Sequence, residues 1–559
     1  MTRLLTRRER RELARQQKRL MPSEPLKSSS WNWLVPCLAA LLVYARTLSF
    51  SFIHDDVAEI SPITTLWHEI SQPVHHSDKY YRPVFSAWMF FVHGFAGLEP
   101  SIWHFASVAL HVLATLIVFR LVFELLDHAF AAGCAAFLFA IHPAHIEAVS
   151  WVLANNEMLY TIFFLSSLLL LSRSLRESRK SYLWLSLGAW MAALFTKETA
   201  VALFPVFFWL AFFEMKATSD WMVRLKCGFF VTLPYAVTTT GYLAARACVL
   251  HVGMIGSAGT IAGRPWPTVL FSSAQVGADY IRKLLWPAGL SPTYDTHLLS
   301  TGTFQMWLIL GFAVCSLCAL AWTAKRYPLV GIGASIIVLP LLPVLYGMRF
   351  FANRELVQDR YLYLPSVGLC LIFGLIVKHV SAAPPEKRTV FTAAGIAYGA
   401  CFLWLLFAQQ GYYASSLRID QRVLELQPDS VGVLDALGRA YLAEGRPDLA
   451  LPEFARAYQL APFNIETRSG LGESLYHEGR YWEARQFLEE LARSSLWMNE
   501  SQNPDILEQH LILLNQLQDI YERTGDAEAA RRISQSVQSF NREISRNHLA
   551  HRLFAGGQE

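Results

Sequence analysis

Long apolar runs separated by short polar segments dominate residues 31–411 of this chain. A helix needs about 20 apolar residues to cross a bilayer, so the pattern predicts a polytopic membrane domain with about eleven spans. The predicted spans are 31–50, 101–126, 130–143, 157–172, 182–195, 199–213, 228–250, 303–323, 328–346, 361–378 and 390–409. Residues 412–559 are instead rich in Glu, Arg, Gln and Ala, which is typical of a soluble helical domain. The sequence therefore predicts an all-α chain with two parts.

The segment 268–286 is apolar but carries Asp279, Arg282 and Lys283 at helical spacing. Charges in mid-bilayer are costly, and basic loops favour the cytoplasm. Placing this segment in the membrane interface keeps the basic loops after 323 and 378 cytoplasmic. The polar loops 51–83, 142–157, 196–198, 251–302 and 347–360 then share the non-cytoplasmic face, as does everything after residue 409. A single long helix over 182–213 would reverse the later part of this topology.

The N-terminal tail, residues 1–30, is basic, with nine Lys/Arg against three Glu in residues 1–27. We interpret it as a cytoplasmic flank that sets orientation rather than as a nucleic-acid-binding segment. The net charge of +4 adds little, because the excess lies mainly in this tail. The eight cysteines all lie in or beside apolar runs, which argues against a disulfide scaffold.

A 34-residue repeat marks the soluble domain, which we place at 412–545, followed by a tail at 546–559. Gly438 and Gly472 are 34 residues apart, as are Ala450 and Ala484. This period and these small residues are typical of tetratricopeptide repeats, whose stacked helix pairs form an α-solenoid. A weaker third copy contains Leu517 and its neighbours. The repeats predict either a concave groove that binds a peptide, such as a protein or peptide acceptor, or a scaffold or dimer contact.

Ionisable and aromatic residues gather in five clusters at the edges of the predicted spans, all on one face in the predicted topology. The clusters are His54-Asp55-Asp56, Lys79-Tyr80-Tyr81-Arg82-Pro83, His142-Pro143-Ala144-His145-Ile146-Glu147 with Asn155-Asn156-Glu157 beyond it, Thr196-Lys197-Glu198, and Gln358-Asp359-Arg360-Tyr361. Ionisable groups converging at a membrane face indicate a functional site.

Each cluster also has a structural explanation. The two aspartates could cap a helix, and Lys197 and Glu198 could form an ion pair at a helix turn. Asp359-Arg360 could be an interfacial anchor. The spacing of His142 and His145 invites a metal site, but Pro143 disturbs the helix geometry that such a site needs, so no metal site is predicted.

These residue types suit the transfer of a sugar from a lipid-linked phosphate. Asp55 or Asp56 would take the proton of an acceptor hydroxyl, and Arg82, Lys197 and Arg360 would bind the departing phosphate. The remaining polar residues would contact the sugar or the acceptor: His54, Tyr81, His142, His145, Glu147, Glu157, Glu198, Asp359 and Tyr361. No Rossmann or P-loop motif occurs in the sequence, which favours a lipid-phosphate donor over a nucleotide sugar. No cofactor is predicted.

The clusters, in this order and followed by tetratricopeptide repeats, resemble the transmembrane and tetratricopeptide repeat-containing protein O-mannosyltransferases and their bacterial relatives. The resemblance runs from about residue 31 to 540. It implies the C-type glycosyltransferase (GT-C) membrane fold, a polyprenyl-phosphate donor of mannose or another hexose, and a catalytic carboxylate at Asp55-Asp56. It also implies repeats on the same side of the membrane as the active site. Many relatives carry a basic residue where this chain has Asn155-Asn156-Glu157.

Two other classes of function fit parts of the pattern. A non-enzymatic membrane scaffold for an envelope complex would explain the repeats but not five ionisable clusters on one face. A transporter would place its charges nearer the bilayer midplane and often shows repeats in its membrane half. The sequence therefore favours a membrane glycosyltransferase. The chain length favours a bacterial plasma membrane, with the active site on the periplasmic side.

Overall fold

The computed structural model describes residues 31–73, 80–215, 220–251, 266–294, 326–347, 357–492 and 504–538, with isolated positions between 307 and 323. Every regular element in these ranges is a helix, so the all-α prediction is confirmed. The chain divides into two compact units, the first ending at Ile419 and the second beginning at Asp420. The span predicted at 303–323 and the tails at 1–30 and 546–559 lie outside the described residues.

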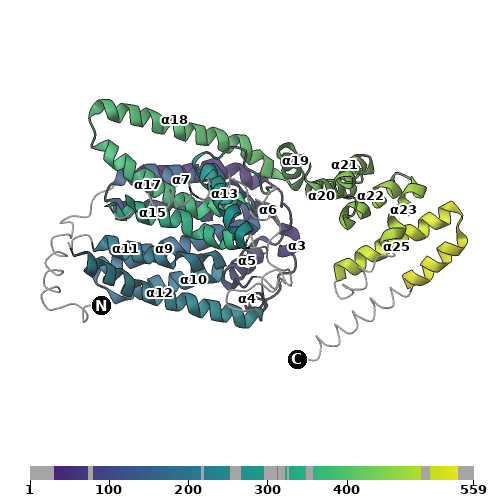
Figure 1. The fold of residues 1–559 in the computed structure, drawn as a ribbon, viewed down its shortest axis with the longest axis horizontal. Coiled ribbons are helices and arrows are strands. Elements are labelled where there is room, and N and C mark those ends of the chain that lie inside the picture. Colours follow the sequence, from purple (N-terminus) through teal and green to yellow (C-terminus); the bar gives the residue numbers. More distant parts are fainter. Residues whose placement is uncertain are drawn as a thin grey trace. The chain divides into compact units, whose positions relative to one another are not determined.

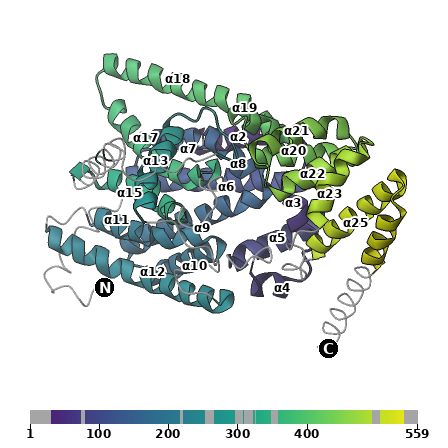
Figure 2. The same cartoon turned by 45° about the vertical axis from the view of Figure 1, so that its right-hand side comes forward.

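The first unit is a set of long helices that run largely side by side, with α18 along one side of the set in both views (Figures 1 and 2). The long helices are α2 (Trp31–Tyr44), α6 (Pro100–Leu126), α7 (Ala129–Ala140), α9 (Asn155–Glu177), α10 (Lys180–Thr196), α11 (Phe204–Glu214), α12 (Trp221–Leu250), α13 (Trp266–Leu285), α15 (Pro328–Val338), α17 (Tyr363–Ser381) and α18 (Pro385–Gln410). The remaining helices of this unit are α3 (Asp56–Ile60), α4 (Leu66–Ser71), α5 (Pro83–Ala96), α8 (Ile146–Ser150) and α16 (Leu342–Gly347).

Six helical stretches in the described ranges are long and apolar enough to cross a membrane, and a bent pair could form a seventh span. They are Trp31–Ser49, Pro100–Leu126, Val152–Glu177, Pro328–Gly347, Asp359–Ser381 and Pro385–Ala414, with Ala129–Ala140 and Pro143–Ser150 bent by 53° as the pair. The chain is therefore a multi-pass membrane protein. The larger number of about eleven spans stays a prediction, as does the interfacial placement of 268–286.

Two local features of this unit bear on the sequence predictions. Residues 182–213 form two helices, α10 and α11, separated by a 3₁₀ helix at Glu198–Leu203, rather than one long helix. The apolar helix α5 was not predicted.

Close packing of α15 on α17 depends on glycine, because a Cβ on Gly368 would come within 2.2 Å of the carbonyl oxygen of Gly333.

The second unit consists of paired helices, and its helices are α20 (Val431–Ala443), α21 (Pro447–Leu460), α22 (Ile465–His477), α23 (Tyr481–Ala492) and α25 (Pro504–Thr524), preceded by α19 (Ser416–Leu426). Phe454 fills the space between neighbouring helices, where a Cβ on Gly438 or Gly470 would come within 2.6 or 2.1 Å of its ring. Leu517 of the degenerate third copy is also buried in this core. Small residues thus leave room for large ones between the paired helices.

Candidate functional site

The first polar loop gives its two aspartates different surroundings. His54 adopts a left-handed backbone conformation with φ of 50°, and Asp55 then occupies the N-cap position of α3 without a side-chain capping hydrogen bond. Asp56 is fully buried (0% exposed) and its carboxylate accepts hydrogen bonds from the backbone N–H groups of Ile53 (3.0 Å) and Leu153 (3.3 Å). Asp55 and His54 remain exposed. Asp56 therefore holds the loop against the segment before α9, whereas Asp55 is presented to the outside.

Burial raises the pKa of Asp56 to about 7, although the N–H groups of Ile53 and Leu153 favour the charged form. Relative to the usual pKa of an aspartate, this shift corresponds to a free-energy difference of about 4 kcal/mol between the protonated and the charged form. A raised pKa in the folded state means that folding takes up a proton between about pH 4 and 7. The contribution of Asp56 to stability is therefore fully present below about pH 4 and is lost as the pH rises through 7.

We expect the thermal midpoint of the detergent-solubilised protein to fall less between pH 5 and pH 8 in Asp56→Asn than in the unsubstituted chain. An amide does not titrate over this range. The variant therefore lacks the pH-dependent stabilisation that the unsubstituted chain loses as the Asp56 carboxyl ionises. Circular dichroism melts at matched ionic strength measure the difference. Parallel falls in the two proteins would contradict the raised pKa.

Three ion pairs connect the other clusters, and none joins neighbours in the sequence. Arg82 at the start of α5 donates from Nε and Nη2 to the two carboxylate oxygens of Glu198, at 2.8 and 2.5 Å. Lys197 pairs with Glu157 at the start of α9, and Arg360 pairs with Glu147 of α8. All three cations were predicted phosphate ligands, and in the structure each has a carboxylate partner.

The backbone at Lys197 explains why Lys197 and Glu198 choose different partners. Lys197 follows the end of α10 in an extended conformation, with φ of −156° and ψ of 130°. Successive side chains of an extended backbone point to opposite sides. The interpretation of Lys197 and Glu198 as one local ion pair is therefore wrong. Burial alone would raise the pKa of Glu198, but the Arg82 guanidinium outweighs it and lowers that pKa to about 2.

Aromatic rings surround these cations. The Arg82 guanidinium lies 4.3 Å from the centroid of the Tyr80 ring, and the Lys197 ammonium lies 4.8 Å from that of Tyr361. Arg360 lies 4.5 Å from the Trp151 ring, which also contacts the His54 ring edge-on. The faces of aromatic rings attract cations, and the effect is larger where water is excluded. Tyr81 instead packs edge-on against Phe195.

Asp359 is not a partner in the three pairs and forms a separate buried contact. Its carboxylate accepts hydrogen bonds from the Tyr294 hydroxyl (2.7 Å) and the Ser291 N–H (2.8 Å), and it lies 3.5 Å from the ammonium of Lys283. Sequence reasoning did not assign Tyr294 or Lys283 to the site. The charge of Lys283 within an apolar segment was the available signal, because a buried lysine needs a carboxylate partner.

The predicted sugar-binding histidines are inside the protein. His142 Nε2 contacts the carbonyl oxygen of Leu284 at 3.0 Å, and His145 Nε2 contacts the Ser366 hydroxyl at 2.7 Å. Both imidazoles are fully buried, and Glu147, Glu157 and Asp359 are at most 1% exposed. Their polar atoms therefore serve contacts within the fold, and direct sugar contact by these five residues stays a prediction. No group of three or more His, Cys, Asp or Glu side chains suited to a metal occurs in the described ranges.

The polar segments meet at one end of the first unit. Hydrogen bonds and ion pairs tie the loop after α2 to the segment before α9, the start of α5 to the end of α10, and the start of α17 to α8. The segment after α18 joins them, because the His54 N–H donates to the Ser416 hydroxyl at 2.9 Å. The short helices α3, α4 and α5 gather near one another in both views (Figures 1 and 2). Lys79 lies outside the described residues.

Comparison with known proteins finds several with similar sequences. Human protein O-mannosyl-transferase TMTC3 is 22% identical over 498 residues, which cover 79% of this chain and 53% of that protein. Human TMTC4 is 23% identical over 77% of this chain and 66% of its own length. Human TMTC1 is 24% identical over 78% of this chain and 55% of its own. The chain is therefore similar to the TMTC protein O-mannosyl-transferases over more than three quarters of its length, at 22–24% identity.

The prediction of tetratricopeptide repeats is confirmed, because the sequence model of that family matches residues 441–495. The chain spans about half to two thirds of the length of the TMTC relatives above. Among solved structures, that of ArnT from Cupriavidus metallidurans bound to undecaprenyl phosphate aligns with 83% of this chain and 81% of its own. Its sequence identity is 16% and the TM-score is 0.37. A bacterial origin of the present chain stays a prediction.

Proposed function

We propose that this protein is a GT-C-type glycosyltransferase that moves mannose or another hexose from a polyprenyl-phosphate donor to a hydroxyl of a protein acceptor. The single observation that carries the proposal is the meeting of an exposed Asp55 with the Arg82, Lys197 and Arg360 pairs at one end of the apolar helices. The names of the homologous O-mannosyl-transferases support the sugar and the acceptor class.

In the proposed reaction, Asp55 accepts the proton of the acceptor hydroxyl while the hydroxyl oxygen attacks the anomeric carbon. The bond from that carbon to the phosphate oxygen breaks, and the lipid phosphate leaves with the bonding electrons. Cationic donors stabilise the charge that develops on the leaving oxygen. A bidentate pair uses two of the five N–H donors of a guanidinium, so Arg82 can bind a phosphate while it still holds Glu198. The mechanism assigns no step to a resident cofactor.

Substitution of Arg82 tests the proposed binding of the donor phosphate most directly. We expect Arg82→Ala to raise the KM for a polyprenyl-phosphate hexose by about tenfold or more, because it removes a charge-assisted phosphate contact. We expect Arg82→Lys to recover only part of this loss, because an ammonium cannot copy the planar fork. Initial rates with varied donor and acceptor, using the protein reconstituted in liposomes, measure both constants.

The control for this test is Arg480→Ala, which removes an exposed guanidinium of the second unit that pairs with Glu483. It should leave the donor KM unchanged. An Arg82→Ala protein in which only the acceptor KM rises would contradict the placement of the phosphate. A chain that transfers no hexose from any polyprenyl-phosphate donor would contradict the proposed function itself.

We further propose that the repeats lie on the non-cytoplasmic side of the membrane and present the acceptor. The basic loops after residues 323 and 378 support this orientation. Ser430, in the turn before α20, is only 4% exposed, but the side chain of the neighbouring Asp429 is 75% exposed. In intact cells, a membrane-impermeant maleimide should label Asp429→Cys more strongly than the unsubstituted chain. Labelling that requires permeabilised membranes would place the repeats in the cytoplasm.

A further inference from the structure

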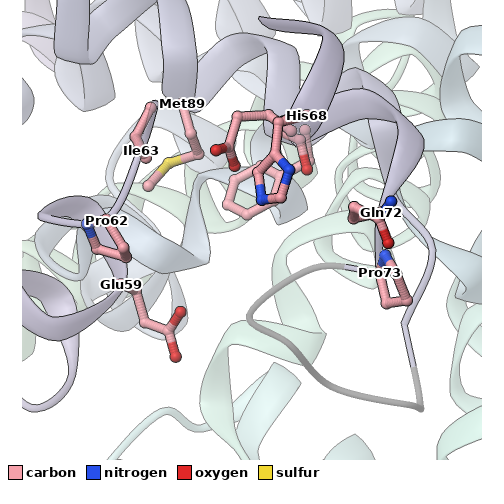
Figure 3. A pocket seen from close by; sticks show the side chains of 10 residues that line it. Glu59, Pro62, Ile63, His68, Gln72, Pro73 and Met89 are labelled. Carbon is pink, nitrogen blue, oxygen red and sulfur yellow. The ribbon is translucent and has the colours of Figure 1, made fainter. Parts of the chain in front are cut away.

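A pocket is lined by residues of α3, α4 and α5 and of the segments next to them (Figure 3). Its apolar wall includes Phe85 and Met89 of α5 and Ile63 after α3. Its polar lining includes two carboxylates, Glu59 of α3 and Glu69 of α4. The picture shows the labelled side chains around an opening, with Pro62 and Ile63 across from Gln72 and Pro73. No site residue predicted from the sequence lines this pocket.

Ser86 of α5 supplies a second kind of polar group to the pocket. Its side chain lines the pocket although the residue is only 6% exposed. Among the described residues no hydrogen bond of its hydroxyl is found, whereas its backbone N–H donates to the Arg82 carbonyl oxygen at 2.9 Å. Its hydroxyl oxygen is not sealed off from solvent, so a ligand or a water in the pocket can hydrogen-bond to it. The pocket therefore combines an apolar wall with polar groups able to bind a ligand.

Helical contacts place this pocket next to the proposed reaction. The Glu59 N–H donates to the Asp55 carbonyl oxygen at 3.0 Å, so Glu59 follows Asp55 by one helical turn. Ser86 follows Arg82 by one turn in the same way. Four residues of α-helix rise about 6 Å. The pocket thus stands about one turn from both the proposed base and the proposed phosphate ligand.

We propose that this pocket binds a lysine or arginine side chain of the acceptor protein, close in sequence to the hydroxyl that receives the sugar. The inference rests on the proposed transferase function and adds a preference for basic acceptors. A long basic side chain buries its aliphatic stem on apolar surface and keeps its charge at polar groups. Phe85, Met89 and Ile63 provide that surface, and His68 also lines the pocket. Glu59 and Glu69 provide carboxylates that complement the charge, and each also keeps an interaction within the protein, which for Glu69 is a hydrogen bond from the Thr64 N–H at 3.3 Å.

The distance restricts where the basic residue stands. An extended chain advances about 3.3–3.6 Å per residue, so a separation of about 6 Å or slightly more corresponds to two or three residues. A Ser or Thr with a Lys two or three positions away therefore fits the pocket and Asp55 together. A Lys six positions away does not.

Synthetic acceptor peptides test the inference with the full-length protein in liposomes. One series carries a single Ser and either Lys or norleucine two, three or six positions away. We expect the KM for Lys at two or three positions to be about tenfold lower than for norleucine, because a charge-assisted contact is worth about that factor. The ratio should fall to within about twofold in the double variant Glu59→Gln/Glu69→Gln. Glu99→Gln, an exposed carboxylate outside the pocket, should retain the full ratio.

The outcomes separate this inference from the proposed function. Transfer to Lys and norleucine peptides with equal KM would overturn the basic-residue preference and leave the transferase proposal intact. A rise of the donor KM in the double variant, with no change of peptide preference, would assign the pocket to the sugar and also overturn the inference. If no peptide received sugar, fluorescence anisotropy of labelled peptides would decide, and equal binding of the Lys and norleucine peptides would reject it.

Discussion

Asp55→Asn is expected to lower the rate of sugar transfer by about 10²–10⁴-fold, because a positioned general base contributes about that factor. Asp55 is exposed at the start of α3, where no side-chain capping bond holds it. Its loss should therefore remove chemistry without disturbing the fold. Initial rates with saturating donor and acceptor, together with thermal midpoints of both proteins, measure the two effects.

Asp56→Asn is the matched comparison, with the same chemical change one residue later. An asparagine can offer only one acceptor oxygen to the two N–H groups that Asp56 binds. We expect this variant to lower the thermal midpoint, whereas Asp55→Asn should not. Near-normal transfer by Asp55→Asn would remove it from the role of base. If Asp56→Asn alone abolished transfer without lowering stability, the roles of the two aspartates would be exchanged.

Lys197→Met is expected to destabilise the first unit by about 3–5 kcal/mol, because it leaves Glu157 buried without its cation. Replacing both partners, as in Lys197→Met/Glu157→Met, should recover most of this loss, since a well-packed apolar pair in place of a buried ion pair is often neutral. Thermal unfolding in detergent, followed by tryptophan fluorescence, measures the three proteins.

The exposed pair of Arg480 and Glu483 is the control for the buried one. Its side chains are 47% and 55% exposed, so Arg480→Met should cost at most about 1 kcal/mol. Equal stability of Lys197→Met and the unsubstituted chain would contradict this expectation. It would mean that the charge of Glu157 is not left uncompensated when Lys197 is replaced. A double variant no more stable than Lys197→Met would indicate that the ion pair itself, and not the uncompensated charge, stabilises the fold.

Sequence reasoning worked best for features that each segment sets by itself. The apolar runs at 101–126 and 361–378 became helices of nearly the predicted extent, because bilayer thickness constrains each run separately. The 34-residue period identified Gly438 and Gly472 as equivalent positions, and both lie against large side chains in the structure. The helix α5 was missed, although its 14 residues equal the length of the span predicted at 130–143.

Partner choice within the site could not be read from the sequence. Lys197 and Glu198 are adjacent, yet they pair with Glu157 and Arg82, residues that are 40 and 116 positions away. The five predicted clusters do contribute to one end of the first unit, but three of their six carboxylates neutralise cations of other clusters. The pocket between α3, α4 and α5 was not predicted either, because residues from three separate helices line it.

The sequence by itself determined the helical class, the apolar runs, the repeats and the positions of ionisable residues at span ends, because hydropathy and periodicity act locally along the chain. The tertiary structure alone decided which carboxylate each cation faces, that Asp56 is buried while Asp55 is exposed, and that Ser86 opens into a pocket with Glu59 and Glu69. These contacts join residues from different helices. Their geometry depends on how helix ends meet, which no local pattern specifies.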